Sequence, residues 1–255
     1  MSIDLNSASA LPDRINWHID HALDAMEEAP RGYLGCSAIG GECERAVQLD
    51  AYASAWRKEW AESGRPPLGG SVPARTRRIF ERGSLLEDSA AKWLLQAGFI
   101  LLQNDPLAGG QFSVSLCGGR LRGHADGIVY GWRGEGPCPV ETPCLWECKV
   151  LGHKWVQAMK REGARKSHPK YYAQVSLYMK GLGLERCLLT VVDADTMDIH
   201  HELIRRDPAE AERMEARFGR IALSCSAGEI LPRASASRSE FMCRMCRHAD
   251  ACWSL

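Results

Sequence analysis

The chain has 255 residues, of which 45% are apolar and 25% are charged, a composition typical of one folded domain with a substantial core and not of a disordered chain. Lys and Arg number 32, as do Asp and Glu, so any surface for nucleic acid must arise from local segregation of charge. No apolar run reaches the roughly 20 residues of a membrane span, and the first residues do not resemble a signal peptide, which favours a soluble cytoplasmic protein.

The first part of the chain is expected to be helical. Apolar periodicity predicts helices over residues 12–28 and 38–60, followed by a loop rich in Pro and Gly over 64–70. A long amphipathic helix is predicted from 73 to 97, and Gly98 suits its C-terminal cap.

The period changes after this helix. Alternation and Gly-rich turns predict strands at 99–104, 111–117, 120–130 and 144–151. Further elements are expected in the order helix, helix, strand, strand, helix, at 153–163, 169–182, 186–193, 196–204 and 208–226. Helices before a sheet and helices interleaved late predict an α/β or α+β fold with a mixed sheet, and we expect α/β, with a mixed central sheet flanked by helices.

The strand at 144–151 carries charged residues inside an apolar run. A period of two places Glu147 and Lys149 on one face, and Trp146 and Cys148 on the other. Asp126, on the preceding strand, together with Glu147 would provide two oxygen ligands for Mg²⁺, with Lys149 as a point charge beside the metal. The alternative for an isolated Glu-x-Lys is a solvated strand face.

Two helical features accompany this strand. Glu87 lies on one stripe of the long helix with Phe80 and Leu94, which places a carboxylate on the apolar face. Gln174 and Tyr178 are i,i+4 partners on one face of a later helix. Buried Glu and Gln can also be purely structural.

Taken in order, the motifs resemble those of the PD-(D/E)xK nuclease superfamily, in its RecB-like branch. They are Arg82-Gly83-x-x-x-Glu87, Gly123-His124-Ala125-Asp126-Gly127, Glu147-Cys148-Lys149 and Gln174-x-x-x-Tyr178. The branch usually has His where this chain has Glu87, and the Glu variant looks like phage-type exonucleases. This departure leaves open whether Glu87 binds metal directly or through water.

The resemblance implies a restriction-endonuclease-like core and a metal-dependent DNA nuclease, with an exonuclease preferred because the similar relatives are largely of that kind. It implies that Glu87, Asp126 and Glu147 hold Mg²⁺ or Mn²⁺, that Lys149 is the catalytic lysine, and that Gln174 and Tyr178 form the accessory motif. The alternative is a non-catalytic DNA-binding or redox-sensing subunit, which would not need the set Asp126, Glu147 and Lys149.

A second constellation lies among the eleven cysteines. Three of them, Cys243-x2-Cys246-x5-Cys252, lie within ten residues of one another, which indicates metal ligation, and Cys43 is the preferred fourth ligand. The arrangement resembles that of the CRISPR-associated adaptation nucleases and the AddB nuclease domain, in which four cysteines hold a [4Fe–4S] cluster. Alternatives are Cys36 or His248 as the fourth ligand and Zn²⁺ as the metal.

The cluster would join the ends of one domain. We expect a single nuclease domain over 1–255 with its core at about 73–226, and with the helical segment 12–60 joined through this metal centre to the Cys-rich tail 240–255. The other cysteines are interpreted as buried or incidental thiols.

Charge is segregated just after the motif strand. Residues 153–172 hold six Lys or Arg against one Glu, with Trp155, Tyr171 and Tyr172 interleaved. Basic groups can follow a phosphate backbone while aromatic faces stack on unpaired bases, so we expect contact with DNA ends or single strands. The alternative is a solvated helix with aromatic side chains in the core. The candidate DNA-binding residues are Lys154, Lys160, Arg161, Arg165, Lys166 and Lys170. A protein partner in recombination, repair or CRISPR adaptation is compatible with this function.

Overall fold

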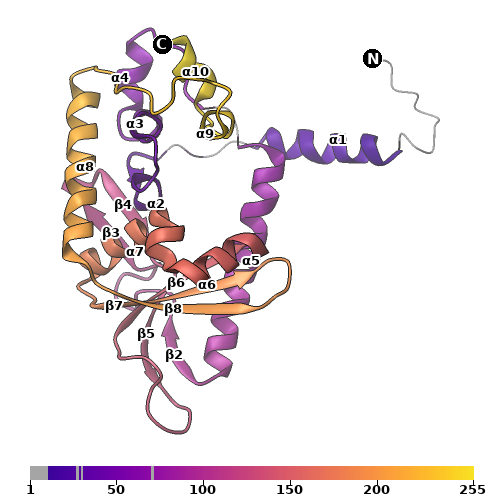
Figure 1. Ribbon diagram of the computed structural model, residues 1–255, viewed down its shortest axis with the longest axis vertical. Coiled ribbons are helices and arrows are strands. Elements are labelled where there is room, and N and C mark those ends of the chain that lie inside the picture. The colour runs from indigo at the N-terminus through magenta and orange to yellow at the C-terminus, as the bar shows by residue number, and fades with distance from the viewer. Residues whose placement is uncertain (1–10, 27–28, 30, 70–71) are drawn as a thin grey trace.

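The computed structural model describes residues 11–26, 29, 31–69 and 72–255, and its larger sheet has helices on both faces (Figure 1). This sheet has the strand order β2-β5-β6-β7-β8. The strands are β2 (Phe99–Leu102), β5 (Gly127–Trp132), β6 (Cys144–Leu151), β7 (Arg186–Asp193) and β8 (Ile199–Arg205). Strands β6 and β7 are parallel and the other pairs are antiparallel. The predicted mixed sheet flanked by helices is confirmed.

A smaller sheet lies beside it, with β1 (Leu34–Gly35), β4 (Leu121–His124) and β3 (Ser113–Leu116) in the order β1-β4-β3. The single strand predicted at 120–130 is therefore wrong, because its two halves belong to different sheets. The break falls at Ala125 and Asp126, where Ala125 N donates to Phe112 O at 2.9 Å and the Asp126 carboxylate accepts from Cys148 N at 2.8 Å. Ala125 is thus bonded to the segment before β3, and Asp126 to β6 of the larger sheet.

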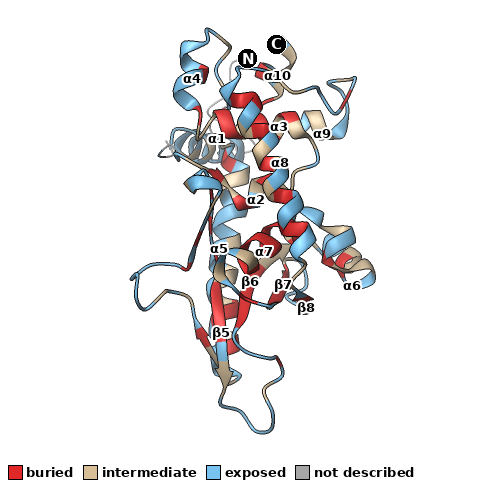
Figure 2. Cartoon of the chain, turned by 90° about the vertical axis from the view of Figure 1, so that its left-hand side faces the viewer, coloured by how far each residue is buried: buried red, intermediate tan, exposed pale blue. Residues whose placement is uncertain are grey.

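The core has one part on each face of the larger sheet. Leu145 packs with residues of α7 (Pro169–Leu182), whereas Trp146 and Cys148 pack with residues of α5 (Ala74–Gln96). The alternation predicted for this strand is therefore present. Figure 2 shows that burial concentrates in β5, β6, β7 and α7. Helix α6 (His153–Ser167) lies beside α7 and next to β7 and β8.

Helix α6 is interrupted at Gly163, where its end was predicted, and a short helical segment follows up to Ser167. Gly163 adopts a φ of +73°, which only glycine adopts readily, and Ala164 N beyond the kink donates to Glu202 Oε2 at 2.8 Å. A strand side chain thus satisfies the backbone where the helix is interrupted.

The predicted helix at 38–60 is divided into three helices. They are α2 (Cys36–Ile39), α3 (Glu44–Tyr52) and α4 (Arg57–Glu62). The first break is at Gly40, where a Cβ would lie 2.8 Å from Lys170 Cα, so the chain passes too close to α7 for any side chain. Helix α1 (Leu11–Asp24) corresponds to the predicted helix 12–28, of which residues 27–28 lie outside the described part.

The end of the chain returns to α3. Helix α8 (Pro208–Ser226) packs on α3, and the tail forms α9 (Phe241–Arg244) and α10 (Ala249–Ser254) nearby (Figure 1). Gln48 of α3 donates to Ser224 Oγ at 2.8 Å and accepts from Leu231 N at 2.9 Å. Across the described parts of the chain, no helix has both the length and the apolar character needed to cross a bilayer.

Gly123→Ala is expected to lower the free energy of unfolding by about 1–3 kcal/mol, the usual effect of overpacking. A Cβ at Gly123 would lie 2.4 Å from Cε1 and 2.6 Å from Oη of Tyr178, a buried ring of α7. Urea unfolding measures the effect. The matched control is Gly219→Ala in α8, where no described atom lies within 4 Å and alanine should stabilise the helix slightly. Equal stability of the Gly123 variant and the wild type would contradict this close approach of β4 to α7.

Candidate active site

Glu147 and Lys149 form an ion pair on the face of β6 that is covered by α7. Glu147 is completely buried, and its Oε1 lies 2.5 Å from Lys149 Nζ. The same oxygen accepts from Gln174 Nε2 at 2.8 Å, and Gln174 Nε2 also lies 3.1 Å from Tyr178 Oη. Gln174 of α7 therefore holds the carboxylate of Glu147, and Tyr178 accepts a hydrogen bond from Gln174.

Asp126 reaches the same centre from the break between β4 and β5. The Cys148 N–H fixes one oxygen of Asp126 against β6. Burial raises the pKa of Asp126, although the charge of Lys149 and the bond from Cys148 oppose this effect. The hydrogen bond from the Cys148 backbone N–H thus keeps the partly buried Asp126 carboxylate beside Glu147 and Lys149.

Glu87 approaches from α5. Burial and the negative charge of Asp126 raise the pKa of Glu87 to about 7, while Lys149 lowers it. The predicted apolar stripe on this helix is only partly buried, because Leu94 is in the core whereas Phe80 is exposed. Glu87 is half-buried between these two positions.

The centre contains more negative than positive charge. Burial and the nearby Asp126 raise the pKa of Glu147 to about 8. Burial alone would lower the pKa of Lys149, but the charges of Glu147 and Asp126 outweigh it and raise that pKa. Three carboxylates thus interact with one permanently charged ammonium, an arrangement that a divalent cation would complement.

One carboxylate oxygen of the centre lacks a hydrogen bond. Glu147 Oε2 is buried, and it has no hydrogen-bond partner among the described residues. A buried carboxylate oxygen without a partner is costly, and a cation would satisfy it. The described part of the chain contains no group of three or more His, Cys, Asp or Glu side chains already arranged to hold a metal ion. The donor chemistry therefore fits a metal, while the ligand set stays a prediction.

The candidate DNA-binding residues are all exposed. They are Lys154, Lys160, Arg161, Arg165 and Lys166 on α6 and Lys170 on α7. Two of them have acidic neighbours, because Arg161 pairs with Glu162 at 2.5 Å and Arg165 with Asp207 at 3.4 Å. Of the interleaved aromatic residues, Trp155 is exposed and Tyr172 is buried.

Sequence reasoning missed His168, which lies at the junction of α6 and α7 and stacks on Tyr171. The available signal was its position directly before Pro169, since a residue before proline commonly ends a helix. Nothing in the sequence pattern connects it with Trp155.

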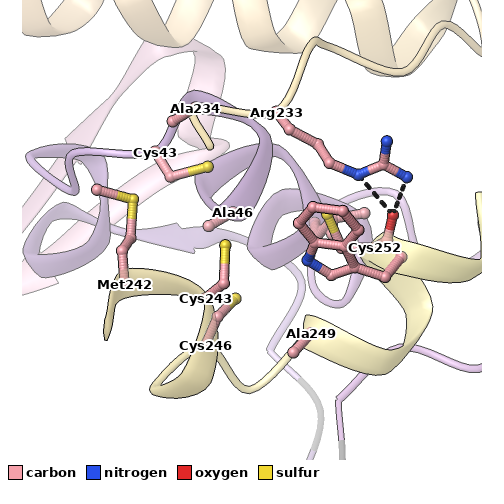
Figure 3. Close-up of a pocket in the computed structure, with 11 residues that line it drawn as sticks. Cys43, Ala46, Arg233, Ala234, Met242, Cys243, Cys246, Ala249 and Cys252 are labelled. Atoms are coloured by element: carbon pink, nitrogen blue, oxygen red, sulfur yellow. Dashed lines mark hydrogen bonds between the residues drawn. The ribbon is translucent and has the colours of Figure 1, made fainter. Parts of the chain in front are cut away.

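The four cysteines of the second constellation line one small cavity of about 40 Å³ (Figure 3). Cys43 lies at the N-terminus of α3, Cys243 in α9 and Cys252 in α10, with Cys246 between these two helices. Figure 3 shows the sulfur atoms of Cys43, Cys243 and Cys246 directed toward the space beside Ala46. Residues two hundred positions apart in sequence therefore meet at this cavity.

The alternative fourth ligands lie elsewhere. Among the described side chains that line the cavity, neither Cys36 nor His248 occurs. His248 is buried with its Nε2 2.8 Å from Asp50 Oδ1, and Cys36 belongs to the core under α7. Of the candidate fourth ligands, Cys43 alone lines the cavity with the three tail cysteines.

Two arginines place positive charge at the cavity. Arg45 Nη1 lies 3.7 Å from Cys252 Sγ, and Arg233 donates to Cys252 O at 2.8 Å. Burial, and the charges of Asp50, Cys252 and Cys43, raise the pKa of the Cys246 thiol. A metal would therefore have to displace protons from these thiols, and the arginines would balance the negative charge of the resulting thiolates.

Comparison with known proteins found no matching family model and no matching curated protein. Among solved structures, an alkaline exonuclease from Laribacter hongkongensis aligns with a TM-score of 0.51 and 17% identity, over 83% of this chain and 93% of that one. Its complex with dAMP aligns with a TM-score of 0.46 and 19% identity, over 77% and 89% of the two chains. A phage-related exonuclease from Haemophilus somnus 129PT aligns with a TM-score of 0.49 and 15% identity, over 81% of this chain and 97% of that one. The chain therefore shares the overall fold of the Laribacter exonuclease.

Proposed function

We propose that this chain is a metal-dependent deoxyribonuclease that hydrolyses phosphodiester bonds at the centre formed by Glu87, Asp126, Glu147 and Lys149. The observation that carries the proposal is the buried Oε2 of Glu147, which has no donor among the described residues. A purely structural ion pair would satisfy both oxygens of a buried carboxylate. The fold shared with an exonuclease agrees with the proposal.

The roles of the residues follow from their charges. Glu87, Asp126 and Glu147 would hold Mg²⁺ or Mn²⁺, which when bound polarises a phosphate oxygen and acidifies water. Lys149 keeps its proton because Glu147 and Asp126 raise its pKa, so it stabilises negative charge on the phosphate and does not act as a base. Gln174 positions Glu147 through the bond to Oε1, and Tyr178 supports Gln174.

An exonuclease acting on DNA ends is the form we propose, since the Laribacter structure whose fold this chain shares is described as an exonuclease. The test is incubation of the protein with end-labelled linear DNA and with circular DNA, each single- and double-stranded, plus Mg²⁺ or Mn²⁺. Release of mononucleotides from linear DNA with circular DNA intact is the expected result. Binding without cleavage in either metal would instead indicate the non-catalytic DNA-binding alternative.

Affinity for Mn²⁺ is expected to rise between about pH 6 and pH 8.5, by up to about tenfold per pH unit for each proton displaced. Glu87 and Glu147, with pKa values of about 7 and about 8, hold protons at the lower pH, and a cation must displace them. Above both values the carboxylates are already ionised. Calorimetry in two buffers of different ionisation enthalpy measures both affinity and proton release. An affinity that does not change with pH would contradict the assignment, and Glu147→Gln should reduce the pH dependence.

We further propose that Cys43, Cys243, Cys246 and Cys252 bind a [4Fe–4S] cluster, with Zn²⁺ as the alternative. Thiolates are ligands for either metal, and the preference for the cluster rests on the resemblance and on the fourth cysteine lying two hundred positions before the other three, beside the same cavity. The Arg45 guanidinium beside Cys252 Sγ supports a negatively charged centre. The cluster would join the segment 12–60 to the tail 240–255 within one domain.

We propose a cytoplasmic location because none of the cysteines forms a disulfide. All eleven cysteines are free thiols in the structure. Free thiols persist in the reducing cytoplasm and are oxidised in most secreted proteins.

A further inference from the structure

A series of ring contacts leads from the proposed catalytic lysine to the surface. Lys149 Nζ lies 5.5 Å from the centroid of the Tyr171 ring. The Tyr171 and His168 rings are parallel to within 5°, with centroids 5.5 Å apart. His168 in turn contacts Trp155, with centroids 5.8 Å apart and an interplanar angle of 74°. The outer end of this series is therefore near the centre without being part of it.

Trp155 at this outer end is exposed to solvent. Its side chain, in the first turn of α6, is 52% exposed, whereas Trp146 of the core is completely buried. Because the two rings are nearly perpendicular, His168 covers at most one face of the indole. About half of the indole is thus accessible to solvent, and a planar base could stack on it.

His168 gives this indole a fixed support. The residue lies where α6 ends and α7 begins, and its Nδ1 lies 2.8 Å from Ser167 Oγ. Burial lowers its pKa, so the ring is neutral at neutral pH and stacks on Tyr171 without adding charge. Because His168 and Tyr171 are already held in place, less side-chain entropy is lost when a ligand binds to these rings.

The surroundings are basic. Lys154 Nζ lies 5.7 Å from the centroid of the Trp155 ring, and Lys166 and Lys170 are exposed on the same two helices. An exposed indole with one ammonium group beside it, on a helix that carries further basic residues, has the chemistry of a site for a base and its flanking phosphates. Bases within a duplex are already stacked on both faces, so such a site selects unpaired nucleotides.

We propose that Trp155, supported by His168, is a stacking site for one unpaired base of single-stranded DNA that leads away from the centre. The inference rests on the proposed nuclease function and names its substrate as a single strand or an unpaired end. Trp155 is a positioning residue in this assignment, since the reacting atoms lie at Lys149 and the carboxylates.

The test measures binding without cleavage. Anisotropy of a labelled oligothymidylate is recorded in EDTA, for the full chain and for Trp155→Ala, Trp155→Phe and Trp17→Ala. Trp17 is the matched control, because its indole is 56% exposed on α1 and also stacks on a histidine, His21, at 5.0 Å. Trp155→Ala is expected to weaken binding about tenfold or more, Trp155→Phe to retain most of it, and Trp17→Ala to change nothing.

Quenching of intrinsic fluorescence by the oligonucleotide should also disappear in Trp155→Ala, with the thermal unfolding curve unchanged. Wild-type affinity of Trp155→Ala, or an equal loss in Trp17→Ala, would overturn the stacking site. An equal loss of affinity for blunt duplex DNA would overturn the selection of single strands. The binding assay contains no metal, so it tests the stacking site separately from cleavage. If DNA binding depends on Trp155 but the protein cuts no DNA when metal is added, the nuclease function is contradicted and the stacking site is not.

Discussion

Lys149→Ala is expected to lower the rate of DNA cleavage by about 10³-fold or more, the loss found when a fixed charge aimed at a transition state is removed. The ammonium is the one cation among three carboxylates at the centre, and its raised pKa keeps it charged throughout the working range of pH. Affinity for DNA should change little, because the exposed basic residues lie on α6 and α7. Single-turnover cleavage at saturating metal, with binding measured in parallel, checks both expectations.

The control for this variant is Lys92→Ala, which removes an exposed lysine from α5, the helix that carries Glu87. Lys149→Ala also leaves Glu147 buried beside Asp126 without a counter-charge, so thermal unfolding must show that the variant is folded at the assay temperature. The isosteric Glu147→Gln provides an independent route, with a similar loss of cleavage and weaker Mn²⁺ binding expected. Wild-type turnover in either variant would mean that the chemistry occurs elsewhere.

Cys43→Ser is expected to remove iron and sulfide from protein purified without oxygen and to lower Tm by about 5 °C or more, since each kcal/mol shifts Tm by about 2–4 °C in a domain of this size. Cys43 lies on α3, and the other three cysteines lie 200 or more positions later, so the cluster would hold the two ends of the chain together. Metal analysis, the visible absorption spectrum and a melting curve measure the loss.

Cys117→Ser is the matched control, because Cys117 is an exposed thiol outside the cavity and should affect neither metal content nor Tm. Zinc retained by the Cys43 variant, with an unchanged melting curve, would contradict the four-cysteine centre. The tail cysteines would then need a ligand of their own, and His248 would have to leave Asp50 to provide it.

Local alternation made the central strand predictable. In β6 each side chain follows the period of two, so the face shared by Glu147 and Lys149 could be assigned from the sequence, as could the opposite face that Trp146 occupies. The pairing of Gln174 with Tyr178 was equally predictable, because a spacing of four places both residues on one side of a helix. Regular backbone geometry determines both placements.

The division of residues 120–130 between two sheets could not be predicted in this way. Both halves form strands, and the break at Asp126 depends on the hydrogen bond from Cys148, a partner 22 positions away. The contact of His168 with Trp155 likewise depends on how two helices pack around the kink at Gly163. Such contacts are tertiary, and a single sequence carries no periodic signal for them.

The meeting of α3 with the tail also sets an order of events during synthesis. Gln48 obtains its partner at Leu231, and Asp50 its partner at His248, only after most of the chain has been made. At translation rates of 5–20 residues per second, α3 waits about 10–40 s for these partners. Its apolar face, including Leu49 and Tyr52, remains uncovered by the tail during that interval. The native contacts at this end of the molecule can therefore form only near the end of synthesis.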